Sequence, residues 1–285
     1  MIRPIPVKKL TCRIVCSNSV KVGATGLLGE HGFAALIEDG SEKILFDTGQ
    51  TGKALVNNLE VMGIKDIRSI VLSHGHYDHS GGLMEFFARY LGRYALYVQS
   101  SVFSRRFKQN DSELREIGMP FLRRELEIAG AEIHESDEPQ LVTDWLSTTG
   151  VIERNSDFEN FEDDFLVEGE AKLEVDRFTD DQAVVARIAG KGLVIVTGCA
   201  HSGIINTINQ AKGLLGEKNV HAIIGGFHLA GEPKERISRT IEALEKADPG
   251  FIIPAHCTGR DAVCALKRAF GRRVIDGDAG LKLTL

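Results

Sequence analysis

The feature that most constrains this chain is a cluster of potential metal ligands directly after an apolar run. His74, His76, Asp78 and His79 fall within six residues and follow Ile70-Val71-Leu72. The apolar run predicts a buried strand, and the two glycines downstream predict the start of a helix. Alternate residues of an extended chain share a face, so His74, His76 and Asp78 point the same way, and His79 adds a fourth group at the turn. Imidazole and carboxylate are typical ligands of zinc, manganese or iron, and the segment therefore predicts a metal site.

Three further histidines have the same placement in the second half of the chain. His201, His228 and His256 each come soon after a predicted strand, and those strands are 193–197, 220–224 and 251–253. Strand ends are where α/β folds place their ligand and catalytic groups. We therefore expect these histidines to join the first cluster, with Cys199 close to them because it precedes His201 by two residues.

Several of these segments resemble a known family. The spacing His74-x-His76-x-Asp78-His79 resembles the signature of the metallo-β-lactamase superfamily, and Phe46-Asp47-Thr48-Gly49 resembles its Asp-Thr-Gly turn. The segments 196–203, 225–229 and 254–259 resemble a narrower subgroup, typified by 7,8-dihydropterin-6-yl-methyl-4-(β-D-ribofuranosyl)aminobenzene-5′-phosphate synthase. The resemblance implies an α/β fold, a four-layer αββα sandwich, in a single domain over residues 1–285. It also implies two divalent metal ions, zinc ahead of iron or manganese.

The resemblance divides the ligands between two ions. The expected sets are His74, His76 and His201 for one ion, and Asp78, His79 and His256 for the other. Many superfamily members have an aspartate that bridges both ions, where this chain has Gly198-Cys199. Either Cys199 provides a thiolate bridge, or the bridge is lost and His201 compensates. Asp180 and Asp181 are alternative carboxylates, although their context favours surface turns.

Three residues near the motifs receive other roles. In the family, the residue matching Asp47 supports the metal ligands from behind; a turn or helix-cap residue is the alternative. His228 is not needed among six ligands, so we assign it to the substrate, where it can stabilise an oxyanion. His31, just before the predicted strand 33–37, could reach a site, but an ordinary edge histidine is the favoured interpretation.

The expected activity is hydrolysis by a metal-bound hydroxide, because coordination lowers the pKa of water to about 7. Asp78 or the hydroxide itself would manage the proton. The substrate is expected to be a small molecule, phosphorylated or of ester type. The alternatives are a synthase-like transferase in pterin cofactor biosynthesis and a non-catalytic ligand sensor on the same fold. A redox di-iron protein usually carries a glutamate where this chain has His76.

The composition of the chain limits the kinds of partner and the location that we expect. A net charge of −6 argues against a non-specific nucleic-acid surface, and no apolar run is long enough to span a membrane. The five cysteines are scattered and odd in number, which favours reduced thiols and a cytoplasmic location. The oligomeric state is left open, with a homodimer as one option.

Two segments interrupt the strand–helix order. Residues 103–130 are expected to be a helical insertion, in which Arg105, Arg106 and Lys108 form either a solvated helix face or a phosphate-binding rim. Residues 153–170 contain eight acidic residues and are expected to form an exposed loop, either simply solvated or acting as a lid.

Overall fold

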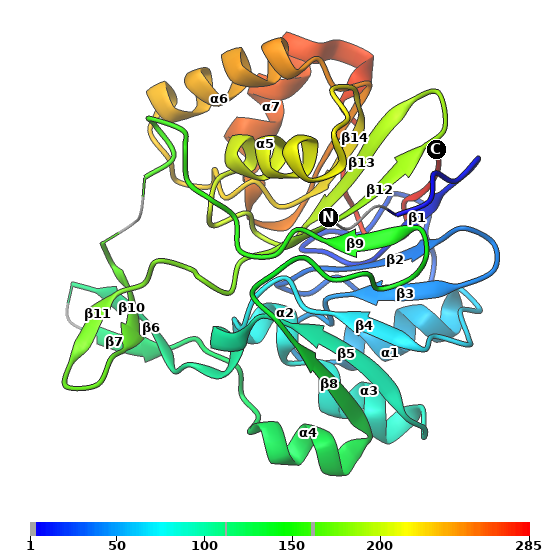
Figure 1. Ribbon diagram of the computed structural model, residues 1–285, viewed down its shortest axis with the longest axis vertical. Helices are drawn as coiled ribbons and strands as arrows, with labels where there is room; N and C mark the ends of the chain where they lie inside the picture. Colours follow the sequence, from blue (N-terminus) through cyan, green and yellow to red (C-terminus); the bar gives the residue numbers. More distant parts are fainter. Residues whose placement is uncertain (1–3, 112, 161–162) are drawn as a thin grey trace.

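The fold is built from two β-sheets that pack face to face, each covered on its outer side by helices (Figure 1). The computed structural model describes residues 4–111, 113–160 and 163–285. The seven-stranded sheet has, in spatial order, β16 (Lys282–Thr284), β1 (Thr11–Cys16), β2 (Ala34–Glu38), β3 (Lys43–Phe46), β4 (Ser69–Val71), β5 (Tyr94–Val98) and β8 (Ala131–Glu135). The five-stranded sheet has β15 (Phe251–Pro254), β14 (Val220–Gly225), β13 (Gly192–Thr197), β12 (Ala183–Ile188) and β9 (Leu146–Thr148).

Parallel pairing brings the important loops together. Strands β3, β4, β5 and β8 pair in parallel, as do β13, β14 and β15. Parallel neighbours end at the same edge of a sheet, so the loops after β3 and β4 share one edge, and those after β13, β14 and β15 share another. Every candidate metal ligand lies in these loops or in the short elements that follow them.

The space between the sheets is filled by apolar side chains from both. Phe33, Phe46 and Val71 come from the first sheet region and pack with Val194 and Ile224 of the second, all fully or almost fully buried. Burying one such side chain contributes roughly 1.5–3 kcal/mol. The sandwich therefore has a large core that does not depend on the polar site.

The outer layers are formed by helices with one apolar face each. Helices α1 (Lys53–Val61), α3 (Leu83–Arg89) and α4 (Arg123–Ala129) cover the first sheet, whereas α5 (Ile204–Leu215), α6 (Lys234–Ala247) and α7 (Arg260–Phe270) cover the second. On α5, Ile204, Ile208 and Ala211 follow helical spacing and are buried. The shorter helical elements are α2 (Tyr77–Ser80), η1 (Ser100–Phe103), η2 (His256–Thr258) and η3 (Gly271–Arg273). The expected four-layer αββα class of fold is confirmed.

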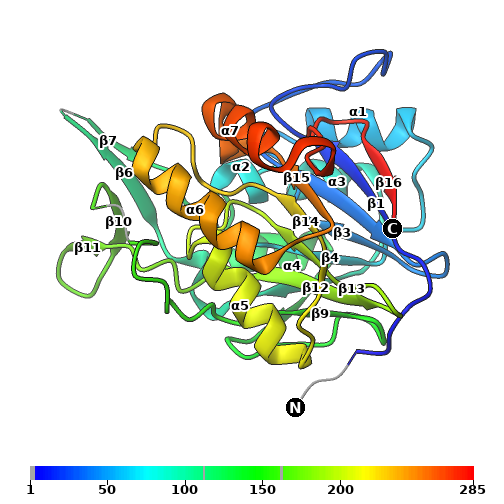
Figure 2. The same cartoon turned by 90° about the horizontal axis from the view of Figure 1, so that it is seen from above.

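The expectation of a helical insertion at 103–130 is wrong for most of its length. Among the described residues of this segment, only Phe103, at the end of η1, and α4 are helical; β6 (Arg106–Asn110) and β7 (Glu113–Glu116) form a hairpin. The hairpin belongs to a third, four-stranded sheet with the order β11-β10-β6-β7, where β10 is Phe165–Glu168 and β11 is Leu173–Val175. This sheet projects from one end of the sandwich (Figures 1 and 2). We refer to it as the small sheet.

The acidic segment 153–170 is also more structured than expected. Its last part forms β10, and Glu159 is only 2 % exposed. The Glu159 carboxylate accepts hydrogen bonds from the backbone amides of Ile205 and Asn206 at 2.9 and 2.8 Å, so it holds the first turn of α5. Residues 161 and 162 of this segment lie outside the described residues. Within the described ranges, no helix is long and apolar enough to cross a membrane.

Candidate metal centre

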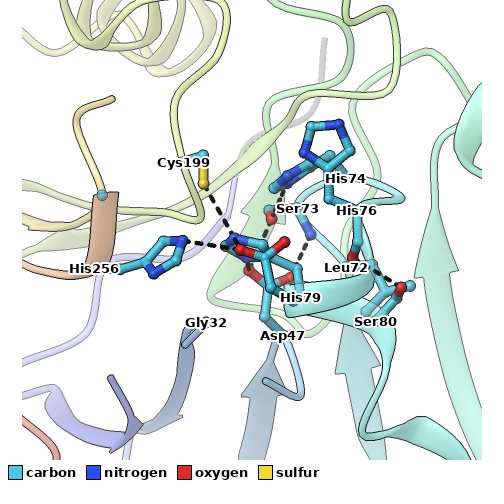
Figure 3. Close-up of polar contacts among 12 residues, drawn as sticks. Gly32, Asp47, Leu72, Ser73, His74, His76, His79, Ser80, Cys199 and His256 are labelled. Atoms are coloured by element: carbon cyan, nitrogen blue, oxygen red, sulfur yellow. Dashed lines mark hydrogen bonds and ion pairs between the residues drawn. The ribbon is translucent and has the colours of Figure 1, made fainter. Parts of the chain in front are cut away.

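The His-x-His segment leaves the end of β4 and leads directly into the short helix α2, which carries Asp78 and His79 (Figure 3). Gly75 lies between the first two histidines because the chain passes very close to another loop there. A Cβ at Gly75 would meet the carbonyl oxygen of Val102 at 2.2 Å, well inside contact distance. Glycine at this position therefore lets the loop pack tightly while His74 and His76 turn into the site.

Three imidazoles form the most buried group. Ligand atoms of His74, His76 and His201 all lie within 4.8 Å of one another. The Nε2 atoms of all three are buried and have no hydrogen-bond partner among the described residues. Burial lowers the pKa of each imidazole well below its ordinary value, which favours the neutral form that binds metals. Because buried polar atoms are normally satisfied, three such nitrogens facing one another fit a cation.

The orientation of His74 is fixed by a relay to Asp47. The Ser73 hydroxyl donates to Asp47 Oδ2 at 2.7 Å, so its oxygen is left to accept from His74 Nδ1–H at 2.8 Å. That bond places the proton on Nδ1 and leaves the lone pair of Nε2 directed at the site. Asp47 Oδ2 also lies 2.7 Å from His79 Nδ1 (Figure 3), and Oδ1 accepts from the Ser73 amide at 2.7 Å. Asp47 thus contacts His79 directly and is linked to His74 through Ser73.

A second group forms around Asp78. Its Oδ2 lies 3.2 Å from His256 Nε2 and 3.8 Å from His79 Nε2. Burial alone raises the pKa of Asp78, but His79, His256 and His31 outweigh it and hold that pKa well below its usual range. Burial likewise lowers the pKa of His79, yet Asp78 and Asp47 reverse this and raise it to about 9. Opposite charges are therefore concentrated at the residues that the resemblance assigned to the second ion.

Cys199 lies between the two groups. Its Sγ is 3.1 Å from His79 Nε2 (Figure 3), and it belongs to three of the five clusters of potential ligands found among the described residues. One of those clusters joins Cys199 to His201 and His228, and another joins it to His256 and Cys257. The Cys199 thiol therefore lies within reach of both groups of potential ligands.

Several residues of the site adopt the left-handed backbone conformation, which is unfavourable for residues other than glycine. Asp47, Ala200, His228 and His256 all have positive φ, between 46° and 60°, in the loops after β3, β13, β14 and β15. Such conformations cost about 1–3 kcal/mol each and persist only where the surroundings enforce them. Their concentration at the strand ends indicates that this part of the chain is shaped for a site.

Asp180 and Asp181 are not surface turn residues, as their sequence context had suggested. Both are 1 % exposed. Asp180 accepts a hydrogen bond from the Gly75 amide at 2.6 Å, and Asp181 accepts one from the Ser202 amide at 2.6 Å. Burial raises the pKa of each to about 6. The two carboxylates therefore hold the loops that carry the histidines.

Of the three cations expected to form a phosphate-binding rim, only Lys108 lines the pocket beside the histidines, which has a volume of about 220 Å³. The expected contact of Arg106 with substrate is wrong, because its side chain is 1 % exposed and pairs with Asp176 and Asp180, both at 2.8 Å. Arg105 does not line the pocket; its guanidinium pairs with Glu116 and Glu168.

His31 and Arg115 are among the pocket residues to which the sequence prediction gave no site role. His31 is no ordinary edge histidine, since its Nε2 lies 3.1 Å from Asp78 Oδ2 and it lines the pocket. The signal was the following glycine: a Cβ on Gly32 would meet the carbonyl oxygen of Asp78 at 2.2 Å. Arg115, on β7, also lines the pocket. A larger cavity of about 490 Å³ lies near the C-terminal ends of α1 and α3; its described lining has no histidine or cysteine, and its two carboxylates, Glu60 and Asp66, belong to none of the ligand clusters among the described residues.

A mixed αββα sandwich with clustered histidines at its strand ends defines a class of metal-binding proteins, and comparisons with known proteins specify the family. Residues 28–256 match the family model of the metallo-β-lactamase superfamily, and the chain belongs to this superfamily. A relative from Methanocaldococcus jannaschii, named 7,8-dihydropterin-6-methyl-4-(β-D-ribofuranosyl)-aminobenzene-5′-phosphate synthase, is 33 % identical over 81 % of this chain and 81 % of its own. An uncharacterized protein of the same organism is 32 % identical over 84 % of this chain and 88 % of its own.

A solved structure agrees with these relatives. A protein described as a metal-dependent hydrolase of the β-lactamase superfamily has a TM-score of 0.83 and 28 % identity, covering 96 % of this chain and 98 % of that chain. The Zn²⁺-bound protein PqqB from Methylobacterium extorquens has a TM-score of 0.59 at 12 % identity, over 96 % of this chain and all of that one, a likeness of fold alone.

Proposed function

We propose that this protein is a metal-dependent hydrolase that acts on a small ester-type or phosphorylated molecule. The observation that carries the proposal is the convergence of three buried Nε2 atoms, from His74, His76 and His201, with no protein partner among the described residues. Asp78, with His256 Nε2 at 3.2 Å and His79 Nε2 at 3.8 Å from its Oδ2, would supply with these two histidines the donors of a second position. Two divalent ions, zinc in the first place, would be held by these groups.

The chain's own residues have separable tasks in this proposal. When bound, the ions would polarise the scissile bond and provide a hydroxide nucleophile at neutral pH. Asp47 orients His79 directly, and His74 through Ser73. Asp78 remains ionised and can accept a hydrogen bond from the nucleophile, and His31 beside it can pass a proton to solvent because its side chain is 53 % exposed. Phe165 and Phe178, which contact His76 and His201, limit the access of water.

The proposal is tested by screening generic substrates with metal-loaded protein. We expect hydrolysis of at least one class among 4-nitrophenyl esters, phosphodiesters, thioesters and lactones. A chelator should abolish the activity, and added zinc or manganese should restore it, because nucleophile and Lewis acid both depend on the ions. A rate unchanged by complete metal removal would contradict the proposal.

A second candidate is favoured by one observation, the 33 % identical relative that is named as a synthase. In that case the same ligands would hold metals that bind a phosphate group of the substrate during a condensation. The two candidates separate in one experiment, in which metal-loaded protein is given the two parts joined in the relative's name, a dihydropterin and a ribofuranosylaminobenzene 5′-phosphate. Formation of a coupled product, with no generic hydrolysis, would favour the synthase.

His228 is proposed to contact the substrate rather than complete a metal site. The six other ligands already give two ions enough donors to leave an open position. His228→Ala should therefore retain the metal content of the wild type and lower turnover or substrate affinity, by about 100- to 1,000-fold for loss of an oxyanion donor. Elemental analysis and steady-state kinetics check both parts. Loss of one metal equivalent in the variant would show that His228 is a ligand, and would move His201 out of its proposed position.

A further inference from the structure

The wall of the pocket away from the histidines is formed by the small sheet. Lys108, Asn110 and Arg115 of the β6–β7 hairpin, with Phe165 of β10, line the same space of about 220 Å³ as His76, His201 and His256. This volume is below the roughly 300–1,000 Å³ that encloses a drug-sized ligand. A group that reaches the hairpin is therefore separated from the metal ligands by only a short spacer.

Arg115 is held in position by the metal-binding loop itself. Its Nη2 donates to the Tyr77 hydroxyl at 2.8 Å, and its guanidinium carbon lies 5.0 Å from the centre of the Tyr77 ring. The Tyr77 amide in turn donates to the carbonyl of Ile117 at 3.0 Å, which links the end of the hairpin to α2. Because Tyr77 directly precedes Asp78, the guanidinium is fixed relative to the proposed reaction centre.

The charge of Arg115 is not neutralised, in contrast to its neighbours. Arg105 pairs with Glu116 and Glu168, Arg106 pairs with Asp176 and Asp180, and Lys108 pairs with Asp164 at 2.7 Å. Across the described ranges, Arg115 makes no ion pair with a carboxylate, although its strand also carries Glu113 and Glu116. An arginine whose guanidinium faces a pocket and makes no ion pair can donate two hydrogen bonds to a carboxylate or phosphate group.

We propose that Arg115 forms an anion subsite of this pocket and that the substrate carries a phosphate or carboxylate group that docks there. The inference rests on the proposed function for the identity of the reacting centre, and it adds the substrate class: a short anionic ester rather than a neutral one. Tyr77 acts as a positioning residue, because it orients the guanidinium without itself offering a charge. Lys108 adds positive potential on the same wall, moderated by Asp164.

Two isosteric esters test the subsite with the holoprotein. Mono-4-nitrophenyl glutarate carries a carboxylate where 4-nitrophenyl pentanoate carries a methyl group, and the scissile bond is the same. Wild type should prefer the glutarate ester. Arg115→Ala should lower kcat/KM for that ester by about 10- to 100-fold, the usual range for a hydrogen bond to a charged group, and change the pentanoate rate by less than about two-fold.

Three variants control for general effects. Arg115→Lys should recover part of the preference, because charge is retained and the bidentate fork is lost. Tyr77→Phe should weaken the preference less than Arg115→Ala does. Lys172→Ala removes a positive charge from the opposite edge of the small sheet, between β10 and β11, and should leave the preference unchanged. An equal loss in Lys172→Ala would mean that only the overall field matters, and would overturn the subsite.

A binding measurement separates the subsite from the hydrolase proposal. Calorimetric titration of wild type and Arg115→Ala with glutarate, and separately with inorganic phosphate, shows which oxyanion the subsite takes. Binding to wild type that weakens in Arg115→Ala supports the subsite even if neither ester is cleaved, in which case the proposed hydrolase alone fails. The subsite would be overturned if wild type and Arg115→Ala bound both anions with equal affinity. It would also be overturned if Arg115→Ala lost activity on both esters to the same extent.

Discussion

Replacement of His76 or His256 by alanine is expected to remove bound metal and activity while leaving the fold intact. Each histidine belongs to a different proposed ligand set, so each variant should lose at least the ion of its own set. Activity should fall by more than about 100-fold, the upper end of what removal of a mere supporting residue costs. The apolar cores between the sheets and under the helices do not involve these side chains, so unfolding should remain cooperative.

The matched control for these variants is His134→Ala. His134 is exposed on β8, the edge strand of the first sheet, and its ring stacks on Tyr97, outside the ligand clusters among the described residues. It should keep full metal content and activity. Elemental analysis, circular dichroism and kinetics on the three variants check the expectation. If His76→Ala or His256→Ala kept the full metal content, that histidine would not be a ligand.

Arg106→Ala is expected to have the largest effect on stability. The guanidinium is buried between Asp176 and Asp180, and its removal leaves two buried carboxylates without the positive charge that they pair with. Breaking a buried ion pair from one side typically costs about 3–5 kcal/mol in free energy of unfolding. Asp180 also accepts from the Gly75 amide, so metal affinity should fall by about 10- to 100-fold as the His-x-His loop loosens.

The neighbouring Arg105→Ala serves as the comparison. Arg105 pairs with two glutamates on the surface of the small sheet, where solvent screens the charges, so its effect should be far smaller than that of Arg106→Ala. Urea unfolding of both variants measures the difference. Equal, small losses for the two arginines would contradict the structural role assigned to Arg106.

The parts of the fold that could be predicted are those in which local pattern and tertiary environment agree. The strands expected over 193–197, 220–224 and 251–253 correspond to β13, β14 and β15 to within one residue at each end, because each is a largely apolar run. The small sheet was missed because its strands are short and charged. Strand β7, Glu113–Glu116, is exposed throughout, and β6 contains three polar residues after Phe107, so their pairing is set by tertiary context.

The candidate site, too, could be predicted only in part. The histidines were predicted because their placement at strand ends is visible along the chain. The role of Arg106 was not, because Asp176 is 70 residues away and the two oppositely charged groups meet only in the fold. In the sequence, Asp180 and Asp181 resemble turn residues. Only in the fold are their carboxylates buried, where each accepts a hydrogen bond from the backbone of a loop that carries a histidine. Arg115 has no local signal, since it is one charged residue in a polar strand.

The central claim is that the strand-end histidines hold divalent metal, and elemental analysis of protein purified without chelators tests it most directly. The ligand sets predict about one to two ions of zinc, iron or manganese per chain, bound tightly enough to survive gel filtration. Folded protein that is free of metal, and that takes up none when zinc, iron or manganese is added, would contradict the account.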